Sequence, residues 1–267
     1  MLKSRKALSE IISTVIIAGS LLIIAAIASW LTVSMFEVQG QQAELERAKE
    51  AFLNLAEAIE EVASKPGASA YVRFSPRAGG VEFQLNYAVI NIMINEYKLI
   101  DKNITGAIRY RGGPYASISS KVILRGNETI LYKNLPWDCS LIVNSSKVPI
   151  AWVYTNPDRG KYIYLDTVRV KVNELGNIII NGYKYKVIEV IFINLTYGEA
   201  HAGTIVDTKV SCIDKTVVVE VFSSESIRIE VNATILSGDA YGSVSIVKGL
   251  DGCVVYFVVS TVRVDFL

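Results

Sequence analysis

The residues whose chemistry stands out lie at the start of the chain, where a carboxylate borders an apolar segment. Lys3, Arg5 and Lys6 precede residues 11–36, which carry no charge, and Glu10 stands between the two. A charge in apolar surroundings needs a partner, because burying it alone costs several kcal/mol. Two roles are therefore open for this carboxylate. It can interact with the positive end of a helix dipole at the headgroup level, or it can pair with a positive group on another chain.

The uncharged segment is long enough to cross a membrane. As a helix, residues 11–36 would rise about 39 Å, which exceeds the roughly 30 Å hydrocarbon core of a bilayer. Basic residues precede it and acidic residues follow it, so the positive-inside rule places Met1 in the cytoplasm and the chain after residue 40 outside the cell. Three fates are open: an uncut anchor, a secretory signal cut after Ala26-Ile27-Ala28, and a cut before the apolar segment.

The third fate rests on a resemblance. Lys6-Ala7-Leu8-Ser9-Glu10, followed by Ile11–Ile16, resembles the processing site and helix start of archaeal type IV pilin-like proteins. That family carries class III signal peptides and also includes archaellins. The resemblance implies that a prepilin peptidase removes residues 1–7 by cutting between Ala7 and Leu8, with Lys6 completing the processing site. It covers the leader and the start of the helix and includes no motif of the remaining chain.

The same resemblance gives Glu10 a role in assembly. Bacterial type IV pilins usually begin with Phe and carry Glu at the fifth mature position, whereas here Leu8 would be first and Glu10 third. Cleavage would leave a free amine on Leu8, and two unit charges 4 Å apart attract by about 4 kcal/mol at an effective dielectric of 20. We expect Glu10 to pair with the amine of a neighbouring subunit and to set the stagger between subunits. The implied partners are identical subunits, the prepilin peptidase, a membrane assembly platform with its ATPase, and the membrane before assembly.

The helix is predicted to continue past the membrane, over residues 8–65 in all. Steps of three and four residues define one apolar seam with a single polar position, as in an amphipathic helix. The seam consists of Val38, Gln41, Leu45, Ala48, Phe52, Leu55, Ile59 and Val62. Gly40 weakens the helix and is a candidate bend, and Pro66-Gly67 ends it. The apolar half would form the membrane span or the filament core, and the seam would lie under the head; a coiled-coil stalk is the alternative.

Beyond residue 70 the apolar residues alternate with period two, and many are Val, Ile or Tyr, which predicts strands. More than a dozen short strands and no second helix predict an α+β protein: a long N-terminal hydrophobic and amphipathic helix, then an all-β antiparallel sandwich head. The head is either one large sandwich or two small ones, residues 70–155 and 160–267, divided at residues 156–161. Asn181-Gly182 predicts a two-residue hairpin.

Modification sites and cysteines are the remaining candidate sites of the head. Five sequons fall on the side predicted to lie outside the cell, and we interpret them as sites of N-glycosylation or as ordinary turn and strand asparagines. They begin at Asn103, Asn127, Asn144, Asn194 and Asn232. Cys139, Cys212 and Cys253 allow one disulfide in three pairings, or serve as three buried small side chains. Their spacing matches no zinc site.

The sequence contains no set of residues typical of catalysis. His201 is the single histidine, and we interpret it as a polar loop residue because no partners for a catalytic set are identifiable. Trp137-Asp138-Cys139 is interpreted as a packing corner. No glycine-rich phosphate loop is present, and a net charge of +1 gives no basic surface for nucleic acid. We expect no enzyme activity, no cofactor, no metal and no nucleic-acid partner.

These observations favour a structural subunit of an archaeal type IV pilus-like surface filament, with adhesion as one function of the filament. The precursor would be held in the cell membrane, and the filament would lie on the cell surface with the head outside. The alternative is an uncleaved single-span anchor whose extracellular β-sandwich acts as a binding or stator-like module. A secreted glycoprotein is the third interpretation.

Overall fold

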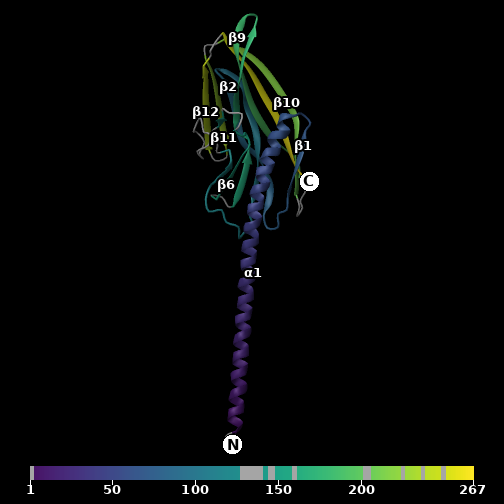
Figure 1. Ribbon diagram of the computed structural model, residues 1–267, viewed down its shortest axis with the longest axis vertical. Coiled ribbons are helices and arrows are strands. Elements are labelled where there is room, and N and C mark those ends of the chain that lie inside the picture. Colours follow the sequence, from purple (N-terminus) through teal and green to yellow (C-terminus); the bar gives the residue numbers. More distant parts are fainter. Residues whose placement is uncertain are drawn as a thin grey trace.

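The computed structural model consists of one long helix and a β-rich head that packs against the C-terminal part of this helix (Figure 1). It describes residues 3–126, 141–143, 148–157, 161–200, 206–223, 226–235, 238–247 and 251–267, with side chains from residue 12 onward. The predicted α+β class is confirmed. The N-terminal half of the helix projects from the head, so the N-terminus and the head lie at opposite ends of the molecule.

Helix α1 (Lys3–Ser64) is continuous from the apolar segment into the amphipathic segment. It passes through Gly40 without a break or a sharp kink (Figure 1). The predicted seam is buried from Gln41 to Val62, whereas Val38 is exposed because the head covers the helix only from Gln41 onward. The tertiary structure therefore divides α1 into two parts. Residues 12–40 are not covered by the head and form what we call the bare half, and residues 41–64 pack against the head and form the enclosed half.

The C-terminal end of α1 is fixed by the turn that follows it and by two strands of the head. Gly67 has a φ of 78°, a left-handed conformation that favours glycine, as the predicted helix stop requires. The last carbonyl groups of a helix lack partners within the helix. Here Lys215 Nζ donates to the carbonyl oxygen of Ser64 at 2.9 Å, and Ser260 Oγ donates to that of Ala63 at 2.7 Å.

The head contains two sheets. The first is six-stranded, in the order β1 (Ser69–Phe74), β10 (Val206–Phe222), β13 (Gly252–Phe266), β9 (Tyr183–Ala200), β8 (Val170–Ile180) and β5 (Ile142–Val143). The second is seven-stranded, in the order β12 (Gly238–Val247), β11 (Ser226–Ile235), β2 (Gly80–Ile94), β3 (Tyr97–Arg111), β7 (Tyr162–Asp166), β6 (Trp152–Asn156) and β4 (Ile123–Arg125). Strands β9 and β10 are far longer than the short strands expected, at 18 and 17 residues.

The sheets are mostly antiparallel, but β13 pairs with β9 and β5 pairs with β8 in parallel. The expectation of a fully antiparallel head needs this refinement. Parallel neighbours require a long connection between them. After β10 the chain leaves the first sheet, forms the β11–β12 hairpin in the second sheet, and returns as β13 between β9 and β10. The last strand of the chain thus lies at the centre of the first sheet.

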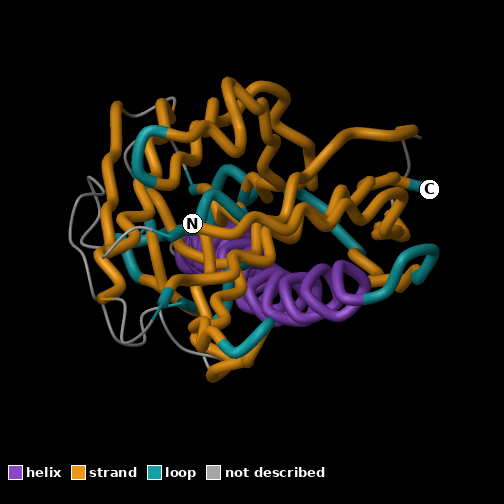
Figure 2. The backbone as a smooth tube through the Cα atoms, turned by 90° about the horizontal axis from the view of Figure 1, so that it is seen from above, coloured by secondary structure: helices purple, strands orange, loops and turns teal. Residues whose placement is uncertain are grey.

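Two hydrophobic cores hold the head together. One lies between the sheets and includes Ile90, Phe192 and Ile229. The other surrounds the enclosed half of α1 and brings strands of both sheets against residues such as Phe52 and Leu55. Figure 2 shows the enclosed helix among the strands, seen from above.

Several strands contribute to both cores through alternate residues. On β6, Trp152 and Tyr154 enter the core between the sheets, while Val153 enters the core around the helix. Side chains on a strand alternate between its two faces, so each face of β6 is covered by a different core. This explains why β6 is buried along its whole length.

Residues 156–161, the predicted boundary between two parts of the head, connect two paired strands. Asn156 on β6 lies opposite Tyr162 on β7, and both strands belong to the second sheet. Each sheet contains strands from before and after this position. The predicted hairpin at Asn181-Gly182 is confirmed between β8 and β9. Both of its residues have positive φ, 52° and 83°, as a type I′ turn requires.

Candidate functional site

The bare half of α1 is a continuous apolar surface. No residue from 12 to 40 is buried by the described part of the chain. Within the described residues, this is the one helix long and apolar enough to cross a membrane. Exposed apolar patches of this size mark interaction with a membrane or with another protein. The exposed large apolar residues include Ile12, Val15, Ile16, Leu21, Leu22, Ile24, Trp30, Leu31, Met35 and Phe36.

Two hydroxyl groups on this surface are satisfied within the helix itself. Ser20 Oγ donates to the carbonyl oxygen of Ile16, and Thr32 Oγ1 donates to that of Ala28, each at 2.8 Å. A hydroxyl group bonded to its own helix needs no water. The bare half can therefore enter lipid or a bundle of similar helices without leaving these groups unsatisfied.

The predicted processing residues Lys6, Ala7 and Leu8 and the predicted assembly residue Glu10 lie on the first turns of α1, in continuous helix. Their side chains are outside the described part of the structure. The cleavage between Ala7 and Leu8 and the pairing of Glu10 therefore stay predictions.

The site where the bare and enclosed halves of α1 meet is a cluster of polar contacts, which we call the clasp. It consists of Gln41, Gln42 and Glu44 on the helix and of two loops of the head, residues 75–79 and 112–118. Two loops of the head thus hold one turn of the helix where it leaves the head.

Gln41, the single polar position of the predicted seam, is buried in the clasp. Its Oε1 accepts a hydrogen bond from the backbone N–H of Tyr115 at 2.7 Å, and its Nε2 donates to Glu37 at 3.4 Å. A Cβ atom at Gly113 would lie 2.5 Å from Gln41 Oε1, so glycine is required for this approach. The polar interruption of the seam is therefore the point where the loop after β3 is tied to the helix.

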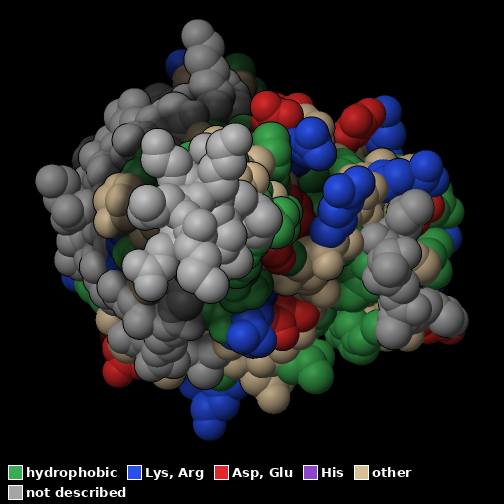
Figure 3. Space-filling view, turned by 90° about the horizontal axis from the view of Figure 1, so that it is seen from below, with side chains coloured by type: hydrophobic (Ala, Val, Ile, Leu, Met, Phe, Trp, Pro, Cys, Tyr) green, Lys and Arg blue, Asp and Glu red, His purple; other side chains and the backbone are tan. Residues whose placement is uncertain are grey.

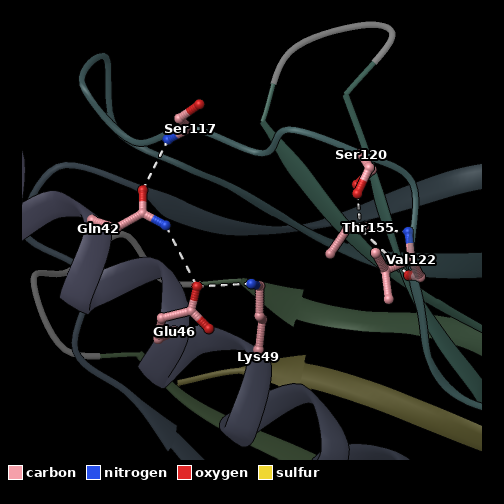
Figure 4. A network of polar contacts seen from close by, with 7 residues as sticks. All are labelled: Gln42, Glu46, Lys49, Ser117, Ser120, Val122 and Thr155. Atoms are coloured by element: carbon pink, nitrogen blue, oxygen red, sulfur yellow. Dashed lines mark hydrogen bonds and ion pairs between the residues drawn. The ribbon is translucent and has the colours of Figure 1, made fainter.

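Gln42 and Thr155 hold the next part of this loop from two sides (Figure 4). Ser117 N–H donates to Gln42 Oε1 at 3.1 Å, and Gln42 Nε2 donates to Glu46 at 3.4 Å. Thr155 Oγ1 accepts from the N–H of Val122 at 2.9 Å and donates to the carbonyl oxygen of Ser120 at 3.1 Å. The segment between β3 and β4 is thus fixed to both the helix and β6.

Glu44 binds the loop after β1. Its carboxylate accepts a hydrogen bond from Tyr110 Oη at 2.6 Å and from the N–H groups of Arg77, Ala78 and Gly79 at 3.0–3.3 Å. Burial raises the pKa of Glu44, but these hydrogen bonds outweigh burial and the net pKa lies below its ordinary value. Burial and the adjacent carboxylate raise the pKa of Tyr110. The clasp therefore contains an ionised Glu44 and a neutral tyrosine at neutral pH.

A second anchor lies further along the helix. Arg125 donates to Glu57 and to Glu60, each at 3.0 Å, and Glu60 also accepts from the backbone N–H of Ala151 at 2.8 Å. Arg125 is largely shielded from solvent, so this pairing is less screened than one on an open surface. The enclosed half of α1 is therefore fixed to the head by polar contacts as well as by its apolar seam.

A groove of about 700 Å³ lies beside the clasp, between α1 and the loop after β1. Its lining combines the apolar rings of Phe36 and Phe74 with charged side chains of both signs, including Arg47 and Arg77. Seen from below, Lys and Arg side chains gather on one side of the described surface, with acidic side chains beside them (Figure 3). The groove therefore presents both apolar and charged groups at the end of the head from which the bare helix emerges.

The other predicted sites are distributed over the head. Asn103, Asn194 and Asn232 lie half-buried in β3, β9 and β11, and Oδ1 of Asn194 is fully enclosed. Asn127 and Asn144 lie outside the described residues, as do His201 and the Trp137-Asp138-Cys139 segment.

Cys212 and Cys253 are both buried, but they cannot bond to each other. Cys212 on β10 lies opposite Val262, which stands towards the other end of β13 from Cys253, about 30 Å away at 3.3 Å per residue. A disulfide needs Cα atoms within about 7 Å. Of the three pairings predicted, the one between Cys212 and Cys253 is therefore wrong. The other two involve Cys139, which lies outside the described residues.

Sequence reasoning missed the clasp, which depends on two glycines of the head. Gly113 allows a close approach to Gln41 of the helix, and Gly79 allows one to Tyr110 of β3, since a Cβ atom at Gly79 would lie 2.2 Å from Tyr110 Oη. Gln41, a lone polar residue in an apolar seam, was the strongest signal. Glu44 gave none, because an exposed acid on a helix is common.

The comparisons with known proteins add no relative: no family model, no curated protein and no solved structure matches this chain. Among the described residues, no three His, Cys, Asp or Glu side chains stand together as ligands for a metal ion.

Proposed function

We propose that this chain is a subunit of a surface filament of the archaeal type IV pilus-like class and that it polymerises through the bare half of α1. The observation that carries this proposal is the division of one unbroken helix into a bare apolar half and a half enclosed by its own head. Lipid and a bundle of identical helices are both apolar surroundings. One surface can therefore hold the precursor in the membrane and later form the filament core.

The clasp supports the proposal because it fixes the direction of the bare helix relative to the head. Contacts from Gln41, Gln42 and Glu44 hold the helix at the point where it emerges. When such helices pack together, the position of each head follows from the packing of its helix. A flexible tether, as in an anchored ectodomain, would not need these contacts.

The N-terminal sequence of the native protein tests the proposal. We expect it to begin at Leu8 and the protein to sediment as filaments. A protein that begins at Met1 would instead be the anchored binding module, and one that begins at Ser29 would be a secreted protein without the bare helix.

A pair of variants tests the assembly role of Glu10. Glu10→Ala should be cut and should reach the membrane, but it should not assemble, because the amine of the neighbour would lose its partner. Glu50→Ala is the matched control: it removes an exposed acid from the same helix, outside the contacts of the clasp. Filaments of normal yield from Glu10→Ala would refute the pairing.

A further inference from the structure

Strand β10 has an open edge along most of its length. β1 pairs with residues 206–211 only, because the chain turns away into α1 before residue 69. Beyond Cys212, β10 has β13 on one side and no described strand on the other. Val217, Val219 and Val221 alternate along this stretch and are 51%, 49% and 56% exposed. A long apolar strand with unpaired backbone groups is a template for another strand.

The opposite side of the same sheet has a second open edge, on β8. β5 pairs only with Val170 and Lys171, so residues 174–180 have β9 on one side and no described strand on the other. The last three residues of this stretch are isoleucines, and the Ile179 side chain is 73% exposed. Figure 1 shows the β8–β9 hairpin at the end of the head farthest from the N-terminus.

The two open edges overlap at one end, where residues 220–222 of β10 are level with residues 174–177 of β8. Glu174 on β8 lies opposite Ile188, which lies opposite Val255, which lies opposite Glu220 on β10. They also run in the same direction, because two of the three pairings between them are antiparallel and one is parallel. Two copies side by side, with their helices parallel, would therefore bring this end of β10 of one copy beside the open stretch of β8 of the next.

We propose that neighbouring heads pair edge to edge, β10 of one copy with β8 of the next, as a parallel pair that continues the six-stranded sheet. The proposal rests on the proposed filament function, which aligns the copies. The two edges differ and lie on opposite sides of the head, so the interface is head-to-tail and repeats along a filament when the rotation between copies does not close. In the paired sheet, the exposed valines of β10 lie on the same face as Ile178 and Ile180 of the neighbour.

Cysteine cross-linking of the full chain tests the pairing. Glu220→Cys is combined with Glu174→Cys, which is level with it, and separately with Asn177→Cys, the next position on the same face. We expect oxidation to give multimers in filaments of at least one double variant, at least about tenfold above each single-cysteine variant.

A charge variant gives an independent readout. Val219→Lys combined with Val221→Lys places two cations on the open edge of β10, whereas Leu85→Lys is the control because Leu85 is also exposed but lies on β2 of the other sheet. We expect the double lysine variant to lower the yield of filaments by at least about tenfold relative to the control.

The outcomes separate this proposal from the proposed function. Filaments that form without the cross-links, and with equal yields for the two lysine variants, would overturn the edge pairing and leave the filament function standing. Cross-linked multimers in membranes that hold no filaments would support the pairing and overturn the filament function. Absence of both filaments and cross-links would overturn both.

Discussion

Two phenylalanines on the same helix should respond in opposite ways to truncation, because the head covers one and not the other. Phe52 is fully buried in the core around α1, where its ring packs edge-on against Phe74 with centroids 5.5 Å apart. Phe36 is 69% exposed on the bare half. We expect Phe52→Ala to unfold the head more easily and Phe36→Ala to leave its stability unchanged.

The expected magnitude for Phe52→Ala follows from burial. A buried phenylalanine removes roughly 150–250 Å² from water, which at about 25 cal/mol per Å² gives an upper limit of about 4–6 kcal/mol. Measured costs of this truncation are about 3–5 kcal/mol, since a cavity remains. The lost ring contact with Phe74 accounts for about 0.5–1.5 kcal/mol of this. Phe36→Ala should change the free energy of unfolding by less than about 0.5 kcal/mol.

The assay is urea unfolding of the full chain in detergent micelles, followed by the circular dichroism of the strands. The midpoint should fall for Phe52→Ala with little change in slope. Under the proposed function, Phe36→Ala should instead lower filament yield while the head stays as stable as in the wild type. Equal losses of stability in the two variants, or a loss below about 1 kcal/mol for Phe52→Ala, would refute the division of α1 into an enclosed and a bare half.

Three further variants test single features by the same unfolding measurement. Glu44→Gln should lower the free energy of unfolding by about 1–2 kcal/mol at neutral pH. Because the folded pKa of Glu44 is lowered, this loss should disappear as the pH falls below about 4. A loss independent of pH would contradict an ionised Glu44 in the clasp. Asp166 is the last residue of β7, and burial raises its pKa to about 6. Wild-type stability should therefore fall as the pH rises from about 4 to 6, and Asp166→Asn should gain about 1–3 kcal/mol relative to wild type over that range. A constant difference between the two proteins would show that this carboxyl does not titrate there. Gly40→Ala should stabilise α1 by about 0.5–1 kcal/mol, since a Cβ atom at Gly40 meets nothing within 4 Å; a loss of stability would indicate strain at this position.

Local patterns in the sequence were sufficient to predict the helix and the presence of the strands. The apolar segment, the seam and the Pro66-Gly67 stop define α1 because helix periodicity and helix termination depend on neighbours within a few residues. The Asn181-Gly182 hairpin follows from the backbone freedom of those two residues alone. Alternation of apolar residues located the strands, although it underestimated their lengths.

The arrangement of those elements depended on contacts between residues far apart in the chain, about which local patterns carry no information. Nothing in the last strand indicates that β13 inserts in parallel between β9 and β10. Periodicity also failed on β6, because two cores cover its two faces and the whole strand is buried. The separation of Cys212 from Cys253 likewise followed only from the register of β10 and β13.

The sequence alone therefore determined that a long helix has an apolar half and leads into a β-rich head, because these features depend only on residue types and short spacings. Only the tertiary structure decided where the head closes around the helix, at Gln41, and which side chains fix it there. The reason is physical: Glu44 and Gln41 acquire their roles from backbone N–H groups 33 to 74 residues away, which reach them only after the sheets have formed.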